Sequence, residues 1–226
     1  MADINVAVFI ESPYVKSFLF ECSKYWASEG DRVCYISNVE QQDLPPHIQG
    51  ASTNSDMYLE FVNISFVTAP NAESLMNFLI NLQKSPHVPR VLVVEDITGY
   101  MSTSDSTEQN FLLLCALLKH ISVTCSKFHK SSVFLILSMK FVPEKLNVIN
   151  FILNPGKIWK TVSGPCDNSN SDVKHFTLQE ISTNPLNNTS RTLEFSLIKK
   201  TEDQLLRLNN IKDLFEESCN FNNKIF

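Results

Sequence analysis

A lysine and a serine stand side by side where a strongly apolar run gives way to a short polar segment. Residues 4–10 are almost all apolar, and Lys16 and Ser17 follow after a turn that holds Pro13. At the start of a helix, a lysine ammonium and a serine hydroxyl can bind phosphate and magnesium when backbone N–H groups surround the phosphates. The arrangement indicates a candidate phosphate site of the strand–loop–helix type.

The turn before Lys16 lacks the glycines that such a site requires. In the pattern GxxxxGK[ST], Ile10 and Val15 stand where the two glycines belong. Glycine permits backbone angles and a close approach that a Cβ atom obstructs, and Pro13 removes one N–H donor. We therefore expect no ATP hydrolysis and no cofactor; weak binding of ATP and Mg²⁺ is the alternative. Lys16 and Ser17 are then vestigial nucleotide-binding residues, and the alternative for Lys16 is a solvated lysine in a first helical turn.

Two acidic residues follow a second apolar run. Glu95 and Asp96 come directly after Val91-Leu92-Val93-Val94. In phosphate-binding-loop enzymes an acid in this place holds Mg²⁺. Many buried strands end in an acid, so the pattern supports a phosphate-binding-loop fold more than it supports a catalytic role. We assign Glu95 and Asp96 to the same vestigial nucleotide site.

The pattern of apolar residues predicts the elements that position these side chains. Continuous apolar runs indicate strands buried on both faces, and helical spacing indicates the segments between them. The expected strands are 4–10, 32–37, 57–67, 90–96 and 133–138, and the expected helices are 16–28, 72–83 and 107–127. Strands that alternate with helices favour a mostly parallel sheet flanked by helices, an α/β fold.

The C-terminal part of the chain follows a different pattern. Segments 175–181 and 191–199 predict an antiparallel hairpin at the edge of the sheet, joined by a turn-rich loop. Residues 202–217 have the apolar spacing of an amphipathic helix. We expect a single domain over 1–226, with a core over 1–160 and the hairpin and helix over 174–217.

Composition narrows the classes of protein. The net charge is −5, which does not favour bulk nucleic-acid binding but permits a local basic patch. No apolar stretch is expected to span a membrane, and the N-terminus lacks the pattern of a secretory signal. The six cysteines show no metal-binding spacing. They fit a reducing compartment, the cytosol or the nucleus.

Two stretches of the sequence resemble a known family. Residues 6–37, with Lys16-Ser17-Phe18-Leu19-Phe20 and Glu29-Gly30, are similar to the start of RecA-type recombinase paralogues. Val91 to Asp96, followed by Gly99-Tyr100-Met101, sits in the matching place. Among these paralogues, the small RecA-like subunits of animal Shu complexes are most similar. Likeness at the level of residues covers about 5–45 and 88–120.

The resemblance implies a RecA-like core and a role in the nucleus, in DNA repair by homologous recombination. It implies a SWIM-domain zinc protein as heterodimer partner, a RecA-type recombinase or its paralogues as further partners, and single-stranded DNA as ligand. The family's catalytic glutamate after the second strand is missing, because Val39 stands there and Glu40 lies one place off. This departure, like the missing glycines, argues against ATP hydrolysis.

Phe66-Val67-Thr68-Ala69 matches the FxxA motif by which recombinase subunits dock on one another. The resemblance thus implies partner-binding roles for Phe66 and Ala69. In recombinases the motif precedes the core, whereas here it falls at a predicted strand. Ordinary core packing is the alternative.

The segment from 119 to 160 is strongly basic. It holds seven lysines and a single acidic residue, Glu144, so its net charge is +6 and the remainder carries −11. Such polarity can bind phosphates despite a negative chain, and the family implies DNA-binding loops near 140–145 and 163–172. We expect Phe141 and Trp159 to offer stacking faces. The lysines expected to contact single-stranded DNA are Lys140, Lys145, Lys157 and Lys160. The alternative is a solvated basic face with both aromatic residues in the core.

A second class of protein remains open. Elongator-type complexes for tRNA modification contain RecA-like subunits without phosphate-binding loops, and the fold alone does not separate the two classes. The length of the chain and the retained Lys16 and Ser17 favour the recombination subunit.

Overall fold

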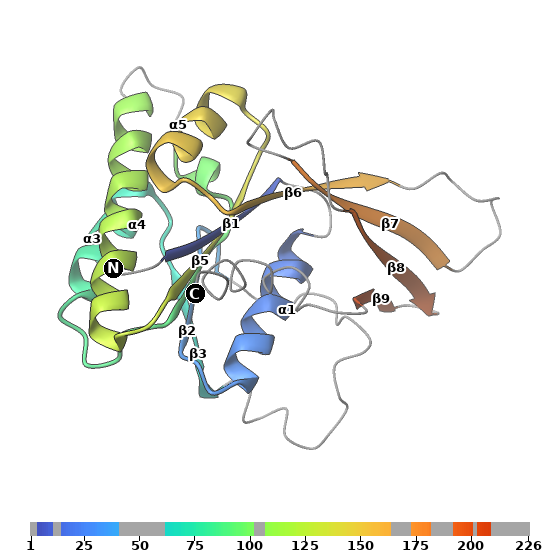
Figure 1. The fold of residues 1–226 in the computed structure, drawn as a ribbon, viewed down its shortest axis with the longest axis horizontal. Helices are drawn as coiled ribbons and strands as arrows, with labels where there is room; N and C mark the ends of the chain where they lie inside the picture. The colour runs from blue at the N-terminus through green and yellow to red at the C-terminus, as the bar shows by residue number, and fades with distance from the viewer. Residues whose placement is uncertain are drawn as a thin grey trace, which may run out of the picture.

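A computed structural model describes residues 4–10, 15–40, 62–101, 107–163, 173–181, 192–200 and 203–208 of the chain. These residues form an α/β fold around one nine-stranded sheet (Figure 1). The strands are β1 (Ile4–Ile10), β2 (Val33–Ser37), β3 (Ile64–Thr68), β4 (Val91–Val94), β5 (Val133–Met139), β6 (Lys157–Ser163), β7 (Val173–Glu180), β8 (Thr192–Lys200) and β9 (Asp203–Leu208). The helices are α1 (Val15–Ser28), α3 (Ala72–Leu82), the short 3-10 helix η1 (Ile97–Tyr100), α4 (Thr107–His129) and α5 (Pro143–Leu153).

The sheet has a parallel part and an antiparallel part. Its strand order is β3-β2-β4-β5-β1-β6-β7-β8-β9. Neighbours from β3 to β6 pair in parallel, and those from β6 to β9 pair antiparallel. Figure 1 shows β7 and β8 extending to the right of α5 and α1. The parallel part therefore forms the core, and the antiparallel strands are an extension of it.

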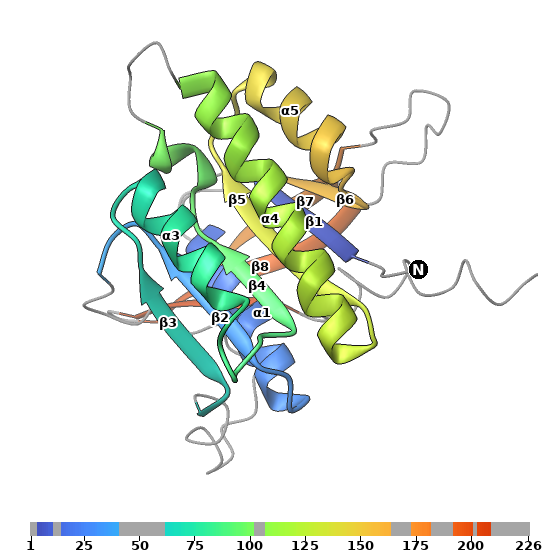
Figure 2. The same cartoon turned by 90° about the vertical axis from the view of Figure 1, so that its left-hand side faces the viewer.

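Helices cover both faces of the parallel strands. Figure 2 shows α3, α4 and α5 side by side over one face, and α1 lies on the other. Alternation along β1 sends Val8 and Ile10 into the core under α4, and Ala7 and Phe9 into the core under α1. Because both faces are covered, β1, β4 and β5 are continuous apolar runs rather than alternating ones.

Local signals fix several element ends. The N-cap of α3 is Asn71, which accepts a hydrogen bond from the backbone N–H of Ser74 and has its own N–H bonded to the Ser74 hydroxyl. Gly30, with φ of 85°, follows α1 in the left-handed region where a glycine avoids strain. The predicted strands and helices up to residue 138 are confirmed within a few residues at their ends, except for the third strand. Its described part is β3, which begins at Ile64, and residues 57–61 of that prediction lie outside the described residues.

Two C-terminal predictions need correction. The predicted hairpin is confirmed as β7 and β8, but β9 lies beyond it at the edge of the sheet. Residues 203–208 are strand β9 and not the start of a helix, because their backbone pairs with β8 from Phe195↔Leu208 to Lys200↔Asp203. A long-range ladder thus overrides the helical spacing of the leucines. The remainder of the predicted helix lies outside the described residues.

The basic segment contains two elements that the apolar pattern did not predict. Residues 143–153 form α5, which begins with Pro143 at a position where a missing N–H is tolerated. Residues 157–163 form β6, which extends the parallel part of the sheet beyond β1. The alternation of strands and helices therefore continues past residue 138.

Helix α4 corrects the expectation about membrane spans. Its residues 109–129 are long and apolar enough to cross a membrane by length and composition. Phe111, Leu114, Leu118 and Ile121 are buried in the core beneath α4. A core helix satisfies the same criterion, and the packing of α4 on the sheet fits that explanation.

Candidate functional site

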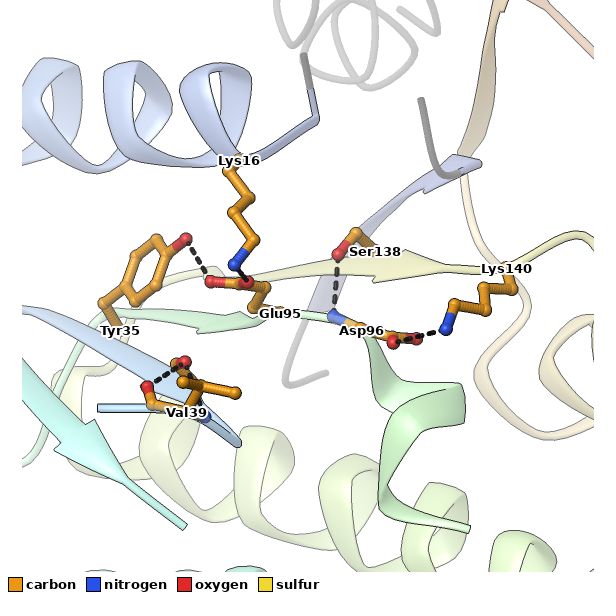
Figure 3. Close-up of polar contacts among 8 residues, drawn as sticks. Lys16, Tyr35, Val39, Glu95, Asp96, Ser138 and Lys140 are labelled. Carbon is orange, nitrogen blue, oxygen red and sulfur yellow. Dashed lines mark hydrogen bonds and ion pairs between the residues drawn. The ribbon is translucent and has the colours of Figure 1, made fainter. Parts of the chain in front are cut away.

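The two predicted halves of the nucleotide site meet at the carboxyl end of the parallel strands. Strand β1 leads through residues 11–14, which lie outside the described part, into α1, whose second residue is Lys16. Strand β4 ends at Val94, directly before Glu95 and Asp96. Strand β5 lies between β1 and β4, and Figure 3 shows Lys16 directed from α1 toward Glu95. Crevices at this end of parallel sheets are where such folds bind ligands.

Lys16 and Glu95 form an ion pair. The Nζ atom of Lys16 lies 2.5 Å from Oε1 of Glu95, with the lysine side chain 62% exposed and that of the glutamate 4% exposed. The hydroxyl of Tyr35, on β2, donates a hydrogen bond of 3.0 Å to Oε2 of Glu95 (Figure 3). Both carboxylate oxygens therefore have a donor within the protein, and the lysine charge is balanced by the acid expected to face a metal ion.

The residues at the glycine positions are part of the core. Ile10 packs in the cluster under α4, and Val15 packs in the cluster under α1. Their side chains are 3% exposed. In this structure the cation and the acid predicted to hold a magnesium nucleotide contact each other, and both glycine positions are filled by core side chains. Ser17 is buried at the first turn of α1, with 5% exposure.

Asp96 organises a tight turn after β4. It adopts a left-handed conformation, with φ of 42° and ψ of 67°, and its Oδ1 accepts hydrogen bonds from the Thr98 hydroxyl and from the backbone N–H of Gly99. Aspartate tolerates this region because its short side chain can bond to the local backbone. The turn leads directly into η1, where the Asp96 side chain acts as the cap.

The turn is tied to the end of β5. The Asp96 backbone N–H donates to the Ser138 hydroxyl at 2.8 Å, and the Lys140 backbone N–H donates to the Thr98 hydroxyl at 3.1 Å. The Lys140 ammonium lies 3.6 Å from Oδ2 of Asp96, and Figure 3 shows the two side chains directed toward each other. Asp96 thus has a structural partner at each of its polar groups, and Lys140, one of the predicted DNA-binding lysines, belongs to the same edge of the sheet.

Val39 lies two residues after the end of β2, at the carboxyl end of the parallel strands, and its side chain is not acidic. Its side chain is 60% exposed, and its backbone N–H and carbonyl both bond to the hydroxyl of Ser37 (Figure 3). The Ser37 hydroxyl therefore fixes the turn that presents Val39.

The predicted DNA-binding lysines fall into two groups. Lys160 lies with its ammonium 5.8 Å from the ring centre of Phe141, which is 55% exposed and adjacent to Lys140. Lys145, on α5, is partly buried, with its ammonium 5.5 Å from the ring centre of Phe111. The structure brings these residues to one side of the sheet, around the start of α5.

Lys157 and Trp159 lie on the other face, under α1. The Lys157 ammonium is 5.8 Å from the ring of Trp159, and Trp159 has no exposed surface and belongs to the core. The expectation that Trp159 offers a stacking face is therefore wrong. Alternation along β6 places Lys157 and Trp159 on the opposite face from Lys160. The Trp159 ring is buried in the core, whereas the Phe141 ring is exposed.

The FxxA-like residues occupy an edge strand. Phe66 lies on β3, is 43% exposed, and packs against Phe20 and Tyr35 with ring centres 6.3 and 5.7 Å away. Ala69 is buried, and its backbone N–H donates to the carbonyl of Ser37. Ala69 thus serves the fold, while one side of Phe66 remains accessible.

Burial shifts the pKa of several groups. The pKa of the Tyr100 phenol is raised by burial, with the Glu95 and Asp96 carboxylates adding to the effect. Burial also raises the pKa of the thiols of Cys34 to about 12 and of Cys125 to about 11. These thiols are therefore protonated and unreactive at neutral pH. In the described part of the chain, no three His, Cys, Asp or Glu side chains gather as a metal site would require.

Sequence reasoning located Lys16, Glu95 and Asp96 but missed their partners. Tyr35 and Ser138 bond to them from strands distant in the sequence, and no local pattern marks a tyrosine or serine within an apolar strand as polar contacts of a site. The only signal was that each is a polar group within an otherwise apolar run.

Searches against family models and against curated proteins found no match to the chain.

Proposed function

We propose that the chain is a RecA-like accessory subunit that binds partners and does not hydrolyse ATP. The observation that carries this proposal is the ion pair between Lys16 and Glu95, with Tyr35 on the second carboxylate oxygen. A phosphate-binding lysine and a magnesium-binding acid act on a nucleotide only when both are available to it. Here each neutralises the other.

The order of the strands supports the RecA-like part of the proposal. Strand β5 lies between β1 and β4, so the helix after β1 faces the acid after β4 across one intervening strand. In phosphate-binding-loop proteins the lysine after the first strand and the acid after a later strand act on the same nucleotide, so the two side chains must lie close together. The retained position of Lys16 relative to Glu95 fits a nucleotide site that has become a structural contact.

The biological role rests on the resemblance to recombinase paralogues. From it we infer a role in the nucleus, in homologous recombination, with a SWIM-domain zinc protein as heterodimer partner and recombinase filaments as the target. Single-stranded DNA is the proposed nucleic-acid ligand. Lys160 and Phe141 support this ligand best, because an exposed ring beside an exposed ammonium group suits base stacking and phosphate contact. Lys140 is exposed next to Phe141 in the chain, and its ammonium lies near Asp96.

A nucleotide titration tests the claim that the chain does not hydrolyse ATP. Mg-ATP is titrated into the full chain by calorimetry, and phosphate release is measured in parallel, for the wild type, Lys16→Ala and the control Lys127→Ala on the exposed end of α4. We expect no saturable binding and no turnover in any of them. Turnover that is lost in Lys16→Ala and kept in Lys127→Ala would contradict the proposal.

Co-purification of the tagged chain tests the assignment of partners. A stoichiometric SWIM-domain zinc protein is the expected result. Recovery of two other RecA-like subunits instead would assign the chain to an Elongator-type ring. The second result would leave the absence of ATP hydrolysis intact, so the two parts of the proposal are tested separately.

A further inference from the structure

Strand β3 forms one edge of the sheet, and its outer side carries no strand. Among the described residues, β2 pairs with β3 on one side and no strand pairs with it on the other. Figure 2 shows β3 at the left-hand edge of the sheet, beside α3. An edge strand presents a row of backbone N–H and C=O groups that another strand can bind. The chemistry of this edge therefore selects an extended strand as its ligand.

The hydrogen bonds to β2 show which residues of β3 face its neighbour. The backbone N–H of Val33 donates to the carbonyl of Asn63, and the N–H of Ala69 donates to the carbonyl of Ser37. Residues that bond to a neighbouring strand alternate with residues that do not. The odd-numbered residues of β3 therefore bond to β2.

The even-numbered residues of β3 direct their backbone groups away from the sheet. These residues are Ile64, Phe66 and Thr68, which alternate with the residues bonded to β2. The next even-numbered residue is Pro70, which has no N–H to donate. The outward-facing row of donors therefore ends at Thr68.

The β3 edge lacks the features that keep strands apart. Residues 62–69 contain no charged residue and no proline, although charges and prolines are the common protection of exposed edges. The strand at the opposite edge, β9, includes Asp203 and Arg207. Helix α3, beside β3, has Glu73 as its single charged residue. Two copies of the β3 edge can therefore approach each other without repulsion between like charges on the strands.

Phe66 lies in the middle of β3 and is partly exposed. Its ring packs against Phe20 and Tyr35, and 43% of the residue remains accessible, whereas Ile64 on the same face is 7% exposed. Aromatic side chains that lie directly opposite each other on antiparallel strands stabilise the pairing. A second phenylalanine ring across the edge would cover the exposed part of Phe66.

We propose that β3 pairs with β3 of a second copy of the chain, antiparallel, with Phe66 opposite Phe66 of the second copy. A twofold axis through this pair places Ile64 opposite Thr68 of the second copy. Residues that face each other in this way exchange both of their backbone hydrogen bonds. Every outward-facing group from Ile64 to Thr68 then has a partner, which a shifted register does not provide. Pairing at this edge is independent of the proposed role in recombination.

A strand of another protein is the competing ligand of the same edge. Two observations favour the second copy. The register centred on Phe66 pairs the outward groups of both strands completely, and the uncharged sequence suits an identical strand. A symmetric contact of this kind forms a closed dimer.

An exchange of charges at Phe66 tests the proposal on the full chain. Dimerisation is measured by sedimentation velocity over a range of concentrations. We expect the wild type to dimerise, and Phe66→Lys and Phe66→Glu each to weaken dimerisation about tenfold or more, because like charges then face each other. An equal mixture of the two variants should restore the dimer, because a lysine then faces a glutamate. A monomeric wild type, or a mixture no better than the single variants, would overturn the proposal.

Phe151→Lys is the matched control for these variants. Phe151 lies on α5 and is 87% exposed, so this substitution makes the same chemical change far from β3. We expect it to change dimerisation less than about twofold. Circular dichroism and urea unfolding show whether each variant is folded. An equal loss of dimer in Phe151→Lys and Phe66→Lys would refute β3 as the contact.

Amide hydrogen exchange, followed by nuclear magnetic resonance, tests the backbone pairing without a substitution. We expect the N–H groups of Phe66 and Thr68 to exchange more slowly as the concentration of the wild type rises. Those of Ser65 and Val67 bond to β2, so their exchange should change less. Dimers in which Phe66 and Thr68 gain no protection would contradict pairing through β3. A monomeric protein would leave the edge to a strand of another protein.

Discussion

The hydroxyl of Tyr35 donates a 3.0 Å hydrogen bond to Oε2 of Glu95, joining β2 to the end of β4 within the buried interior. Glu95 is 3% exposed, and Tyr35 has no exposed surface. A buried carboxylate requires donors at both oxygens, and here Tyr35 and Lys16 supply them. Glu95 therefore has a structural role that does not depend on a bound nucleotide.

Removing the Tyr35 hydroxyl should destabilise the protein. We expect Tyr35→Phe to lower the free energy of unfolding by about 1–3 kcal/mol, because a buried charged acceptor loses a donor. Urea unfolding measures the change. Ser28→Ala, which removes a hydrogen bond at an exposed position, serves as control and should cost less than about 0.5 kcal/mol. If Tyr35→Phe is no more costly than this control, the bond contributes nothing to stability.

Gly99 should not accept a side chain. An added Cβ would lie 2.7 Å from Oδ2 of Asp96 and 2.8 Å from Nδ2 of Asn38. Asp96 cannot move away easily, because its other oxygen accepts two hydrogen bonds within the turn. We expect Gly99→Ala to lower the free energy of unfolding by about 1–3 kcal/mol, measured by urea denaturation.

Gly156→Ala is the matched control for that substitution. A Cβ at Gly156 would meet only the Val6 carbonyl oxygen, at 3.8 Å, an ordinary contact. Its expected cost is below about 1 kcal/mol. Similar losses in the two variants would show that the turn around Asp96 is not tightly packed.

Stability should fall in alkali because of the buried thiols. The pKa values of Cys34, Cys115 and Cys125 are raised by burial from an ordinary 9.0 to about 12, 12 and 11. Below pH 9 the thiols are protonated in both states, and the stabilisation is fully present. Above it the unfolded thiols ionise first, so stability declines up to the folded pKa, by at most about 1.4 kcal/mol per thiol and pH unit.

Urea unfolding between neutral pH and about pH 10.5 measures this decline. Cys125→Ala removes one such thiol, so its free energy of unfolding should depend less steeply on pH above 9 than that of the wild type. The variant also loses some stability at neutral pH, but that loss is independent of pH. Parallel pH profiles for the two proteins would disprove the assignment.

If the proposed DNA ligand is correct, it should depend on one side of the sheet only. We expect Lys140→Glu and Lys160→Glu to weaken single-stranded DNA binding and each to lower the slope of log K against log salt by about 0.7. Phe141→Ala should weaken binding about tenfold, with the slope unchanged. Fluorescence anisotropy over a range of salt concentrations measures both quantities.

Lys127→Glu is the control for these variants, because Lys127 is exposed near the far end of α4. We expect it to change neither the affinity nor the slope of DNA binding. Unchanged binding in Lys140→Glu and Lys160→Glu would remove single-stranded DNA from the proposal. Equal loss in all three lysine variants would indicate a diffuse electrostatic attraction instead of a site.

The sequence by itself determined the parallel core and its helices up to β5. Apolar runs such as Val91–Val94 and helical spacing such as that of α1 act over a few residues, so they can be interpreted locally. It also located Lys16, Glu95 and Asp96, because motif residues lie at the ends of those runs. The sequence did not predict β9, because the backbone hydrogen bonds that make residues 203–208 a strand come from β8.

Only the tertiary structure decided what the polar residues contact. Strand order places β5 between β1 and β4, and that order brings Lys16 to Glu95 and Ser138 to Asp96. Likewise, the pleat of β6 turns Trp159 into the core and Lys160 outward. These outcomes depend on which distant strands become neighbours, a competition among whole packings that no short stretch of sequence encodes.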